Sequence, residues 1–261
     1  MKKGSFVAAM MMVFCVICIG CKMGDETNSM AKSTNTYAVV VGMEKSQFAG
    51  ECPGAGYDAD RMYKLLEQYT AGLVLLRDNN ATKANVVDAL TRAIENAGNG
   101  LVVFYYSGHG GSEPFPDTGI EETDGKDEFL CLWDTWLRDN DIWKMIQKCK
   151  GRFFMISDSC HSQTQFRSPT FRLKPLLAWD TTLNENHQFS LLCWSGCPDN
   201  TYSYGASTGG QFTNALLRHF NSKKTYEYLW DEIKNDKTLR AYENPQSTAI
   251  GNGFVGKSIF R

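Results

Sequence analysis

Short apolar runs alternate with amphipathic stretches along the chain. Residues 37–43 form a β-branched apolar run suited to a central strand buried on both faces, and further apolar runs cover residues 73–78, 101–107 and 152–157. A further run covers residues 127–133. The pattern therefore predicts five short strands.

Helical periodicity fills gaps between several of these runs. The stretch from Tyr57 has acids in its first turn, and residues 80–97 form a second amphipathic stretch with Thr82 as the expected N-cap. A third helix is predicted over residues 141–150, with Asp141 as a candidate N-cap. The expected apolar positions of the first two helices are Met62, Leu65, Leu66, Val86, Val87, Leu90 and Ile94. Strands separated by helices indicate an α/β domain with a parallel sheet covered on both faces.

Two of the predicted strands end on chemically active side chains. The run "LVVFYYSGHGG" leads into His109, and the run "RFFMISDSCHS" leads into Cys160. In a parallel sheet, right-handed crossovers bring the carboxyl ends of the strands to one edge, where sites form. We therefore expect His109 and Cys160 to meet at that edge.

A histidine beside a cysteine suits attack on a carbonyl group. A thiol attacks as its thiolate, and a neighbouring imidazole takes or shares its proton. Gly108 and Gly110 would let the backbone turn sharply and approach a substrate closely. The N–H groups of Gly110 and Cys160 are candidate donors to the oxyanion of a tetrahedral intermediate, where losing one donor typically costs about 10²–10³ in rate.

Length and charge narrow the class of protein. The chain has 261 residues, 43% of them hydrophobic, and a formal net charge of -2. Without a leader, the remaining length suits one sizeable α/β domain. The small net charge implies no general attraction for nucleic acid or for an anionic membrane.

The N-terminus has the pattern of an export signal. Lys2 and Lys3 precede an apolar run over residues 6–19, and small residues follow. A basic start, a short apolar stretch and a small-residue end are typical of a secretory signal peptide. The run is too short to span a bilayer comfortably as a mature helix.

The end of this leader resembles the lipobox of bacterial lipoproteins. Gly20 precedes Cys21, although Cys18 stands where leucine is usual. The resemblance implies a signal peptide over residues 1–20 and lipidation of Cys21. Residues 21–36 would then form a flexible tether to a domain over residues 37–261. An ordinary signal peptide cut elsewhere is the alternative.

Six cysteines remain in the predicted domain. Export permits disulfides, but the spacing is irregular, and cysteines within apolar runs are better explained as buried small hydrophobes. A zinc site is disfavoured because Cys193 and Cys197 lack a second cysteine pair at ligand spacing. If Cys160 stays a thiol, an odd number remains, so the pairing is left open among Cys52, Cys131, Cys149, Cys193 and Cys197.

The two boxes resemble those of caspase-like peptidases, and metacaspases fit best. "YYSGHGG" and "SDSCHS" lie about fifty residues apart, as in caspases. Support comes also from "YDADRMYKLL", from "NATKANVVDAL" and from the segment over residues 195–217. This resemblance implies an αβα sandwich around a mostly parallel six-stranded sheet. It identifies the chain as a suspected metacaspase or bacterial orthocaspase.

The resemblance also implies roles for particular residues. His109 would be the general base and Cys160 the nucleophile of a cysteine endopeptidase. Asp158, Asp58 and Ser107 match residues that line the metacaspase specificity pocket, although Tyr57 replaces the asparagine usual before Asp58. Two carboxylates in a narrow pocket favour a basic side chain, so cleavage after Arg or Lys is predicted. A helix-terminal acid is the alternative for Asp58.

Calcium is a further expectation from the resemblance. Asp124, Asp139 and Asp141 fall near the calcium aspartates of the family, and hard oxygen ligands suit Ca²⁺. An acidic solvated loop is the competing explanation. The acid expected shortly after the nucleophile is absent from "HSQTQFR". Calcium is thus a candidate activator, and no cofactor is required for the chemistry itself.

The connector after the nucleophile, residues 161–187, corresponds to a segment that caspase relatives often cut during activation. Arg167, Arg172 and Lys174 are its candidate self-cleavage sites. An uncut loop that shapes the pocket is the alternative.

Three readings of the whole chain follow. The first is a monomeric endopeptidase acting on proteins or peptides, lipid-anchored in the bacterial cell envelope at the outer membrane or periplasmic face. The second is a non-catalytic envelope lipoprotein that binds peptides on the same fold. The third is a peptidase similar to clostripain or gingipain, which metacaspase-like segments outside the two boxes disfavour.

Overall fold

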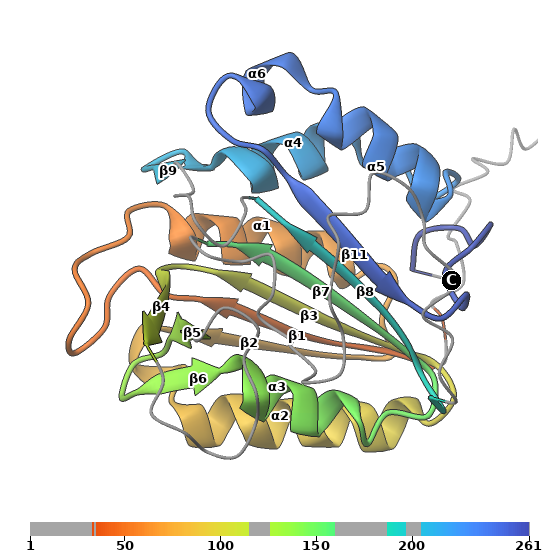
Figure 1. The fold of residues 1–261 in the computed structure, drawn as a ribbon, viewed down its shortest axis with the longest axis horizontal. Helices are drawn as coiled ribbons and strands as arrows, with labels where there is room; N and C mark the ends of the chain where they lie inside the picture. Colours follow the sequence, from red (N-terminus) through yellow and green to blue (C-terminus); the bar gives the residue numbers. More distant parts are fainter. Residues whose placement is uncertain (1–32, 34, 115–125, 160–186, 197–204, 261) are drawn as a thin grey trace, which may run out of the picture. The chain divides into compact units, whose positions relative to one another are not determined.

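The apolar runs form the centre of one sheet. The computed structural model describes residues 33, 35–114, 126–159, 187–196 and 205–260. Its six-stranded sheet has the order β11-β8-β7-β3-β1-β2 (Figure 1). The strands are β1 (Thr36–Gly42), β2 (Gly72–Arg77), β3 (Leu101–Ser107), β7 (Arg152–Asp158), β8 (Ser190–Ser195) and β11 (Gln246–Ile250). All neighbours pair in parallel except β11, which is antiparallel to β8, so the predicted mostly parallel sheet is confirmed.

Helices cover both faces of this sheet. In Figure 1, α2 (Lys83–Ala97) and α3 (Asp139–Ile146) lie below the sheet, while α4 (Gln211–His219) and α5 (Tyr226–Lys234) lie above it. The helix α1 (Ala55–Leu66) packs on the same face as α4 and α5, because Met62 and Leu66 share a buried cluster with Leu216 and Leu229. The short α6 (Lys237–Arg240) follows α5. The α/β class with helices on both faces is therefore confirmed.

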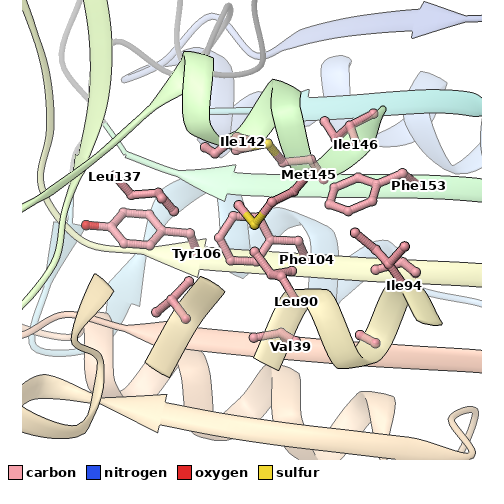
Figure 2. Close-up of a cluster of buried hydrophobic side chains, with 14 of the residues drawn as sticks. Val39, Leu90, Ile94, Phe104, Tyr106, Leu137, Ile142, Met145, Ile146 and Phe153 are labelled. Atoms are coloured by element: carbon pink, nitrogen blue, oxygen red, sulfur yellow. The ribbon is translucent and has the colours of Figure 1, made fainter. Parts of the chain in front are cut away.

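The alternation of side chains along β3 explains why both faces must be covered. Val102, Phe104 and Tyr106 belong to the buried cluster between the sheet and the helices α2 and α3, and Figure 2 shows part of this cluster. The intervening residues of β3 belong to the cluster on the other face. Every residue of β3 is buried. Burying one large apolar side chain contributes about 1.5–3 kcal/mol, so both helical layers stabilise β3.

The local signals for the helices are confirmed at one N-cap and wrong at another. Thr82 caps α2, because its Oγ1 accepts a hydrogen bond from the Asn85 N–H at 3.2 Å. The third helix begins at Asp139 rather than after Asp141, so Asp141 is not its N-cap. Its first turn is shifted because Arg138, the last residue of β6 (Trp136–Arg138), leads directly into it.

The apolar run over residues 127–133 does not join the central sheet. It forms β5 (Lys126–Cys131), the middle strand of a separate antiparallel sheet with β4 (Gly110–Pro114) and β6. Its partners are the strands directly before and after it in the chain, and both pair with it in antiparallel register. Antiparallel pairing of successive strands needs no helical crossover. A second small hairpin consists of β9 (Gly205–Ala206) and β10 (Gly209–Gly210).

Three observations bear on export, disulfides and the domain. Among the helices in the described part of the chain, none is long and apolar enough to cross a membrane. No disulfide joins two of the four described cysteines, and Cys131, Cys149 and Cys193 are buried. The described elements all belong to one compact unit, residues 31–261. The predicted leader over residues 1–20 and the lipidation site Cys21 lie outside the described residues.

Candidate active site

The carboxyl ends of β3 and β7 meet in register at one edge of the central sheet. Ser107, the last residue of β3, pairs with Asp158, the last residue of β7. The Gly108 N–H continues this pairing by donating to the Asp158 carbonyl at 3.3 Å. His109 follows Ser107 by two positions, and Cys160 follows Asp158 by two positions. Cys160 itself lies outside the described residues, but the two strand ends that lead to the predicted pair are neighbours.

Gly108 makes the turn that carries the chain out of β3. Its φ is +155°, and an added Cβ would come within 2.7 Å of the Tyr106 hydroxyl and 2.8 Å of the Met43 Cβ. A side chain at this position would therefore collide with the core beneath the turn. Gly110, in contrast, has no positive φ and begins β4, so the sharp turn expected at both glycines is confined to Gly108.

A backbone carbonyl lies against the imidazole of His109. The His109 Nε2 is 3.2 Å from the carbonyl oxygen of Glu51. If this nitrogen carries the proton and donates, the other ring nitrogen, Nδ1, is left with its lone pair. The backbone of His109 is also fixed, because its carbonyl accepts from the Tyr106 hydroxyl at 2.7 Å. The imidazole is thus held in a form that can accept a proton at Nδ1.

The loop that supplies the Glu51 carbonyl is tied to the sheet by an aspartate. Asp78 Oδ1 accepts hydrogen bonds from the N–H groups of Glu44 and Lys45, both at 2.9 Å. The Cys52 N–H then donates to the Glu44 carbonyl at 2.8 Å. Sequence reasoning missed Glu51 because it acts through its backbone, and a carbonyl leaves no mark on the identity of the side chain.

The two predicted pocket acids lie buried beside this edge. Asp58 on α1 is 1% exposed and Asp158 is 4% exposed. Asp58 Oδ2 accepts from the Ser107 hydroxyl at 3.0 Å and from the Gly210 N–H at 2.8 Å. Asp158 Oδ2 accepts from the Thr213 N–H at 2.8 Å. The structure therefore brings Asp58, Asp158 and Ser107 together, with the Gly210 N–H of β10 donating to Asp58 and the Thr213 N–H of α4 donating to Asp158.

Burial and the neighbouring carboxylate change the proton affinity of Asp58. Burial, followed by the charge of Asp158, raises the pKa of Asp58 to about 7. The Gly210 N–H and the Arg61 guanidinium oppose this rise. Burial and the same two carboxylates raise the pKa of Tyr105 well above its usual value, and the Tyr105 hydroxyl lies 2.6 Å from Thr213 Oγ1. Two buried acids held close together provide a place where a cation would be stabilised.

Arg61 is a member of this cluster that sequence reasoning did not single out. Its Nη2 lies 2.5 Å from Asp58 Oδ1, one helical turn further along α1. The spacing i,i+3 on a predicted helix was an available signal, because residues at that spacing are neighbours on the helix surface. The same spacing is common on solvated helix faces, so it does not by itself indicate a site.

The two calcium candidates that the structure describes, Asp141 and Asp139, make separate contacts. Asp141 forms an ion pair with Lys83, with 2.6 Å between Asp141 Oδ2 and Lys83 Nζ. Asp139 is buried, and its Oδ1 accepts from the Asn140 N–H at 2.6 Å. Asp124 lies outside the described residues. Within the described ranges, no three His, Cys, Asp or Glu side chains are grouped closely enough to hold a metal ion, so the calcium site stays a prediction.

Two other features of the sequence, the self-cleavage candidates and a serine motif, do not add described residues to this edge of the sheet. The self-cleavage candidates Arg167, Arg172 and Lys174 lie outside the described residues. A G-x-S-x-G spacing occurs at residues 205–209, but Ser207 lies at the exposed turn between β9 and β10. A nucleophile elbow joins a strand to a helix. Ser207 is therefore not in such an elbow, and this spacing does not support a serine hydrolase.

Comparison with known proteins agrees with this geometry. The family model of the caspase domain matches residues 35–245. Metacaspase-4 of Arabidopsis thaliana is 33% identical over 138 residues, which is 48% of this chain and 33% of that protein. Metacaspase-1 of Kluyveromyces lactis is 29% identical over 207 residues, 70% of this chain and 47% of that protein. The match thus spans a third to a half of the length of these two relatives.

Solved structures share the fold. Protein GSU0716 from Geobacter sulfurreducens superposes with a TM-score of 0.66 at 24% identity, covering 87% of this chain and 98% of that one. Caspase-1 from Spodoptera frugiperda superposes with a TM-score of 0.51 at 14% identity, covering 87% of this chain and 89% of that one. With the match of the family model and the in-register ends of β3 and β7, these findings show that the chain belongs to the caspase-domain family, as a metacaspase-like member.

Proposed function

We propose that the chain is a cysteine endopeptidase that cleaves proteins or peptides after Arg or Lys. The observation that carries the proposal is the in-register pairing of Ser107 with Asp158, because it leads the His109 and Cys160 segments to one edge of the sheet. Membership in the caspase-domain family supports the same chemistry.

The catalytic pair would work by nucleophilic catalysis. His109 Nδ1 takes the proton of the Cys160 thiol, and the thiolate attacks the carbonyl carbon of the scissile peptide bond. The N–H groups of Gly110 and Cys160 stabilise the resulting oxyanion. The imidazolium then protonates the leaving amine, the C–N bond breaks, and a thioester remains. Water, deprotonated by the same imidazole, attacks the thioester, releases the new carboxylate and restores the thiol.

The hydrogen bond at Glu51 supports the role of His109 as the base. A ring that donates from Nε2 to a carbonyl keeps its lone pair on Nδ1, and the positive charge formed after proton transfer lies next to the partial negative charge of that carbonyl. This arrangement stabilises the imidazolium without a third charged side chain.

The acid cluster supports the specificity for basic side chains. A guanidinium or ammonium group entering between Asp58 and Asp158 would relieve the repulsion that raises the pKa of Asp58. Ser107 and the N–H groups at the start of α4 orient the two carboxylates. An acidic side chain would add a third negative charge to the same buried place. Cleavage after Asp is therefore disfavoured.

Three further parts of the proposal concern regulation and location. Basic residues in the connector, Arg167, Arg172 and Lys174, suit the specificity of the enzyme itself, so self-cleavage there is proposed. Calcium is proposed as an activator through Asp124, Asp139 and Asp141. Lipidation of Cys21 would anchor the enzyme in the bacterial cell envelope.

Fluorogenic peptides with Arg, Lys or Asp at the cleaved position, with and without calcium, test the proposal. We expect release of the fluorophore from the Arg and Lys peptides, and its loss in Cys160→Ala and His109→Ala. On a denaturing gel, the active chain should split while Cys160→Ala stays intact. Failure of the wild-type protein to cleave any of the three peptides, together with no selective labelling of Cys160 by an arginyl chloromethylketone, would favour the non-catalytic peptide binder.

A further inference from the structure

Arg61 lies within the buried acid cluster rather than on a solvated helix face. Its Nη2 is 2.5 Å from Asp58 Oδ1, and the side chain of Asp58 is 1% exposed while that of Arg61 is 25% exposed. Ion pairs on helix surfaces are ordinarily exposed at both partners, as in the pair between Arg92 and Asp88, whose side chains are 72% and 58% exposed. Asp58, the acidic partner of Arg61, is therefore not screened by water.

Three neighbours fix the guanidinium of Arg61. Its central carbon lies 4.4 Å from the centroid of the Tyr57 ring, within the range of a cation–π contact. The backbone of Gly209 passes so close that an added Cβ would overlap both Arg61 Nη2 and Asp58 Oδ1. Arg61 Nε is buried, and no partner for it occurs among the described residues. The guanidinium is thus committed to Asp58 on one edge and covered by Tyr57 and Gly209.

The groups that face Asp58 come from every element around it. Ser107 and Tyr105 approach from β3, Asp158 from β7, the Gly210 N–H from β10 and Arg61 from α1. Ser107 and Gly210 contribute uncharged donors, and Asp158 contributes a like charge. Arg61 is the cation that these described contacts place directly against the carboxylate.

We infer that Arg61 is a specificity-determining positioning residue, which orients Asp58 beside Asp158, favours its ionised form and so sets the lowest pH at which the pocket accepts a basic side chain. This inference rests on the proposed function of the same pocket. In chemical terms, the fixed guanidinium of Arg61 favours the carboxylate form of Asp58. Above the lowest pH that it sets, a guanidinium or ammonium group of the substrate then meets a carboxylate rather than a carboxylic acid.

The direction of the effect follows from electrostatics. Arg61 opposes the rise in the pKa of Asp58 that burial and Asp158 cause. Removing the guanidinium therefore raises this pKa further, and Asp58 binds its proton across a wider range of pH. A protonated Asp58 offers a weaker site for a cation. Binding of a cation should then require more alkaline solution in the variant than in the wild-type protein.

Binding of benzamidine, a soluble aromatic amidinium, tests this inference without turnover. Calorimetric titrations of the Cys160→Ala full chain would be made from acidic to mildly alkaline pH, alone and with Arg61→Gln, Arg61→Lys or Arg92→Gln. We expect Arg61→Gln to move the pH midpoint of binding upward by about one unit, which is about a tenfold loss of affinity below the midpoint. Arg61→Lys should restore most of the shift, and Arg92→Gln should leave the midpoint unchanged.

The outcomes separate this inference from the proposed function. If the parent protein binds benzamidine and Arg61→Gln changes the melting temperature without moving the midpoint, Arg61 is merely structural and the inference is overturned. If the parent binds no benzamidine at any pH, the basic specificity itself is wrong. In the Cys160-containing enzyme, Arg61→Gln should raise KM for Arg peptides below the midpoint while kcat changes little, and an equal loss in kcat would also contradict the inference.

Discussion

Two acid clusters built from similar groups lie at the two ends of α4, and the pKa values of Asp58 and Asp236 in them are shifted in opposite directions. At the start of α4, the Thr213 N–H donates to Asp158, and the charge of Asp158 acts on Asp58, the ion-pair partner of Arg61. At its end, Arg218 and His219 both contact Asp236, with His219 Nε2 at 2.7 Å from Asp236 Oδ2. Each cluster combines buried carboxylate oxygen, arginine and backbone N–H donors.

The balance of charges explains the opposite pKa shifts. Burial pushes the pKa of Asp236 upward, but the Leu239 N–H, His219 and Arg218 outweigh it and hold the value at about 2. Burial, reinforced by the second carboxylate, raises the pKa of Asp58 to about 7. One acid among two basic side chains is satisfied, whereas two acids beside Arg61 retain affinity for a further cation. The cluster around Asp236 therefore suits a structural role, since Asp236 also caps α6. The cluster of Asp58 and Asp158 suits binding of a cation.

The largest expected effect that tests this contrast is on cleavage. Asp158→Asn should lower kcat/KM for Arg peptides by about 10²–10³-fold, because truncating one charge of a buried pair costs about 2–5 kcal/mol. Asp236→Asn, at the other end of α4, should leave kcat/KM within about twofold, because this residue lies away from the pocket acids and its effect should be independent of theirs. The rate of Cys160 alkylation by iodoacetamide checks that the nucleophile is unaffected. Equal losses in the two variants would remove the distinction between the clusters.

The pH dependence of stability should have opposite signs for the two acids. Asp58 keeps its proton in the folded state up to about pH 7 but loses it near 3.8 when unfolded, so its contribution to stability falls as pH rises between these values. Asp236 stabilises the fold above its unfolded pKa of 3.8, and this contribution, about 2 kcal/mol, is lost as pH falls toward 2.

Urea unfolding at a series of pH values measures both slopes. Asp58→Asn should remove the decline of the unfolding free energy between about pH 4 and pH 7, and Asp236→Asn should remove the rise between about pH 2 and pH 4. The difference between each variant and the wild-type protein isolates one acid from all the others. Changes of the same sign in both variants would contradict the assigned protonation states.

The smallest expected effect concerns the glycine that covers the acid cluster. Gly209 has φ +96°, and an added Cβ would overlap Asp58 and Arg61, whereas Gly98, with φ +54°, has nothing within 4 Å of such a Cβ. Both Gly→Ala changes cost backbone strain of about 1–2 kcal/mol. Gly209→Ala should cost about 1–3 kcal/mol more, because it also displaces the packed side chains. Thermal melts of the two variants measure the difference, and equal costs would show that the cover over Asp58 is loose.

Much of the fold follows from signals that lie close together in the sequence. Continuous apolar runs predicted β1, β3 and β7, because a strand buried on both faces needs apolar residues at nearly every position. A similar run predicted β2, which lies at the edge of the sheet and is only partly buried. The threonine before α2 predicted its start, because a hydroxyl at that place satisfies an N–H left unpaired at any helix end. The place of His109 just past a strand end followed from the same pattern.

Other features depended on which distant segments pack together. The run over residues 127–133 was predicted as a further strand like those of the central sheet, but β5 pairs with its chain neighbours β4 and β6 in the antiparallel sheet. The residues alone did not indicate that Asp58 and Asp158 meet. A family resemblance implied it, and the register of β3 with β7 and the packing of α1 on that face bring it about. His219 had no partner pattern in the sequence, yet it contacts Asp236 because α4 and α6 pack side by side.

The sequence by itself determined the alternation of the main strands and helices as far as β7, the apolar faces of the first two helices and the chemistry available at the strand ends, because these depend on neighbouring residues and on periodicities of two and 3.6. The tertiary structure alone decided the Glu51 carbonyl at His109, the Arg61 guanidinium against Asp58 and the opposite proton affinities at the two ends of α4. Such properties depend on burial and on distances between charges, and both arise only when segments far apart in the chain come together.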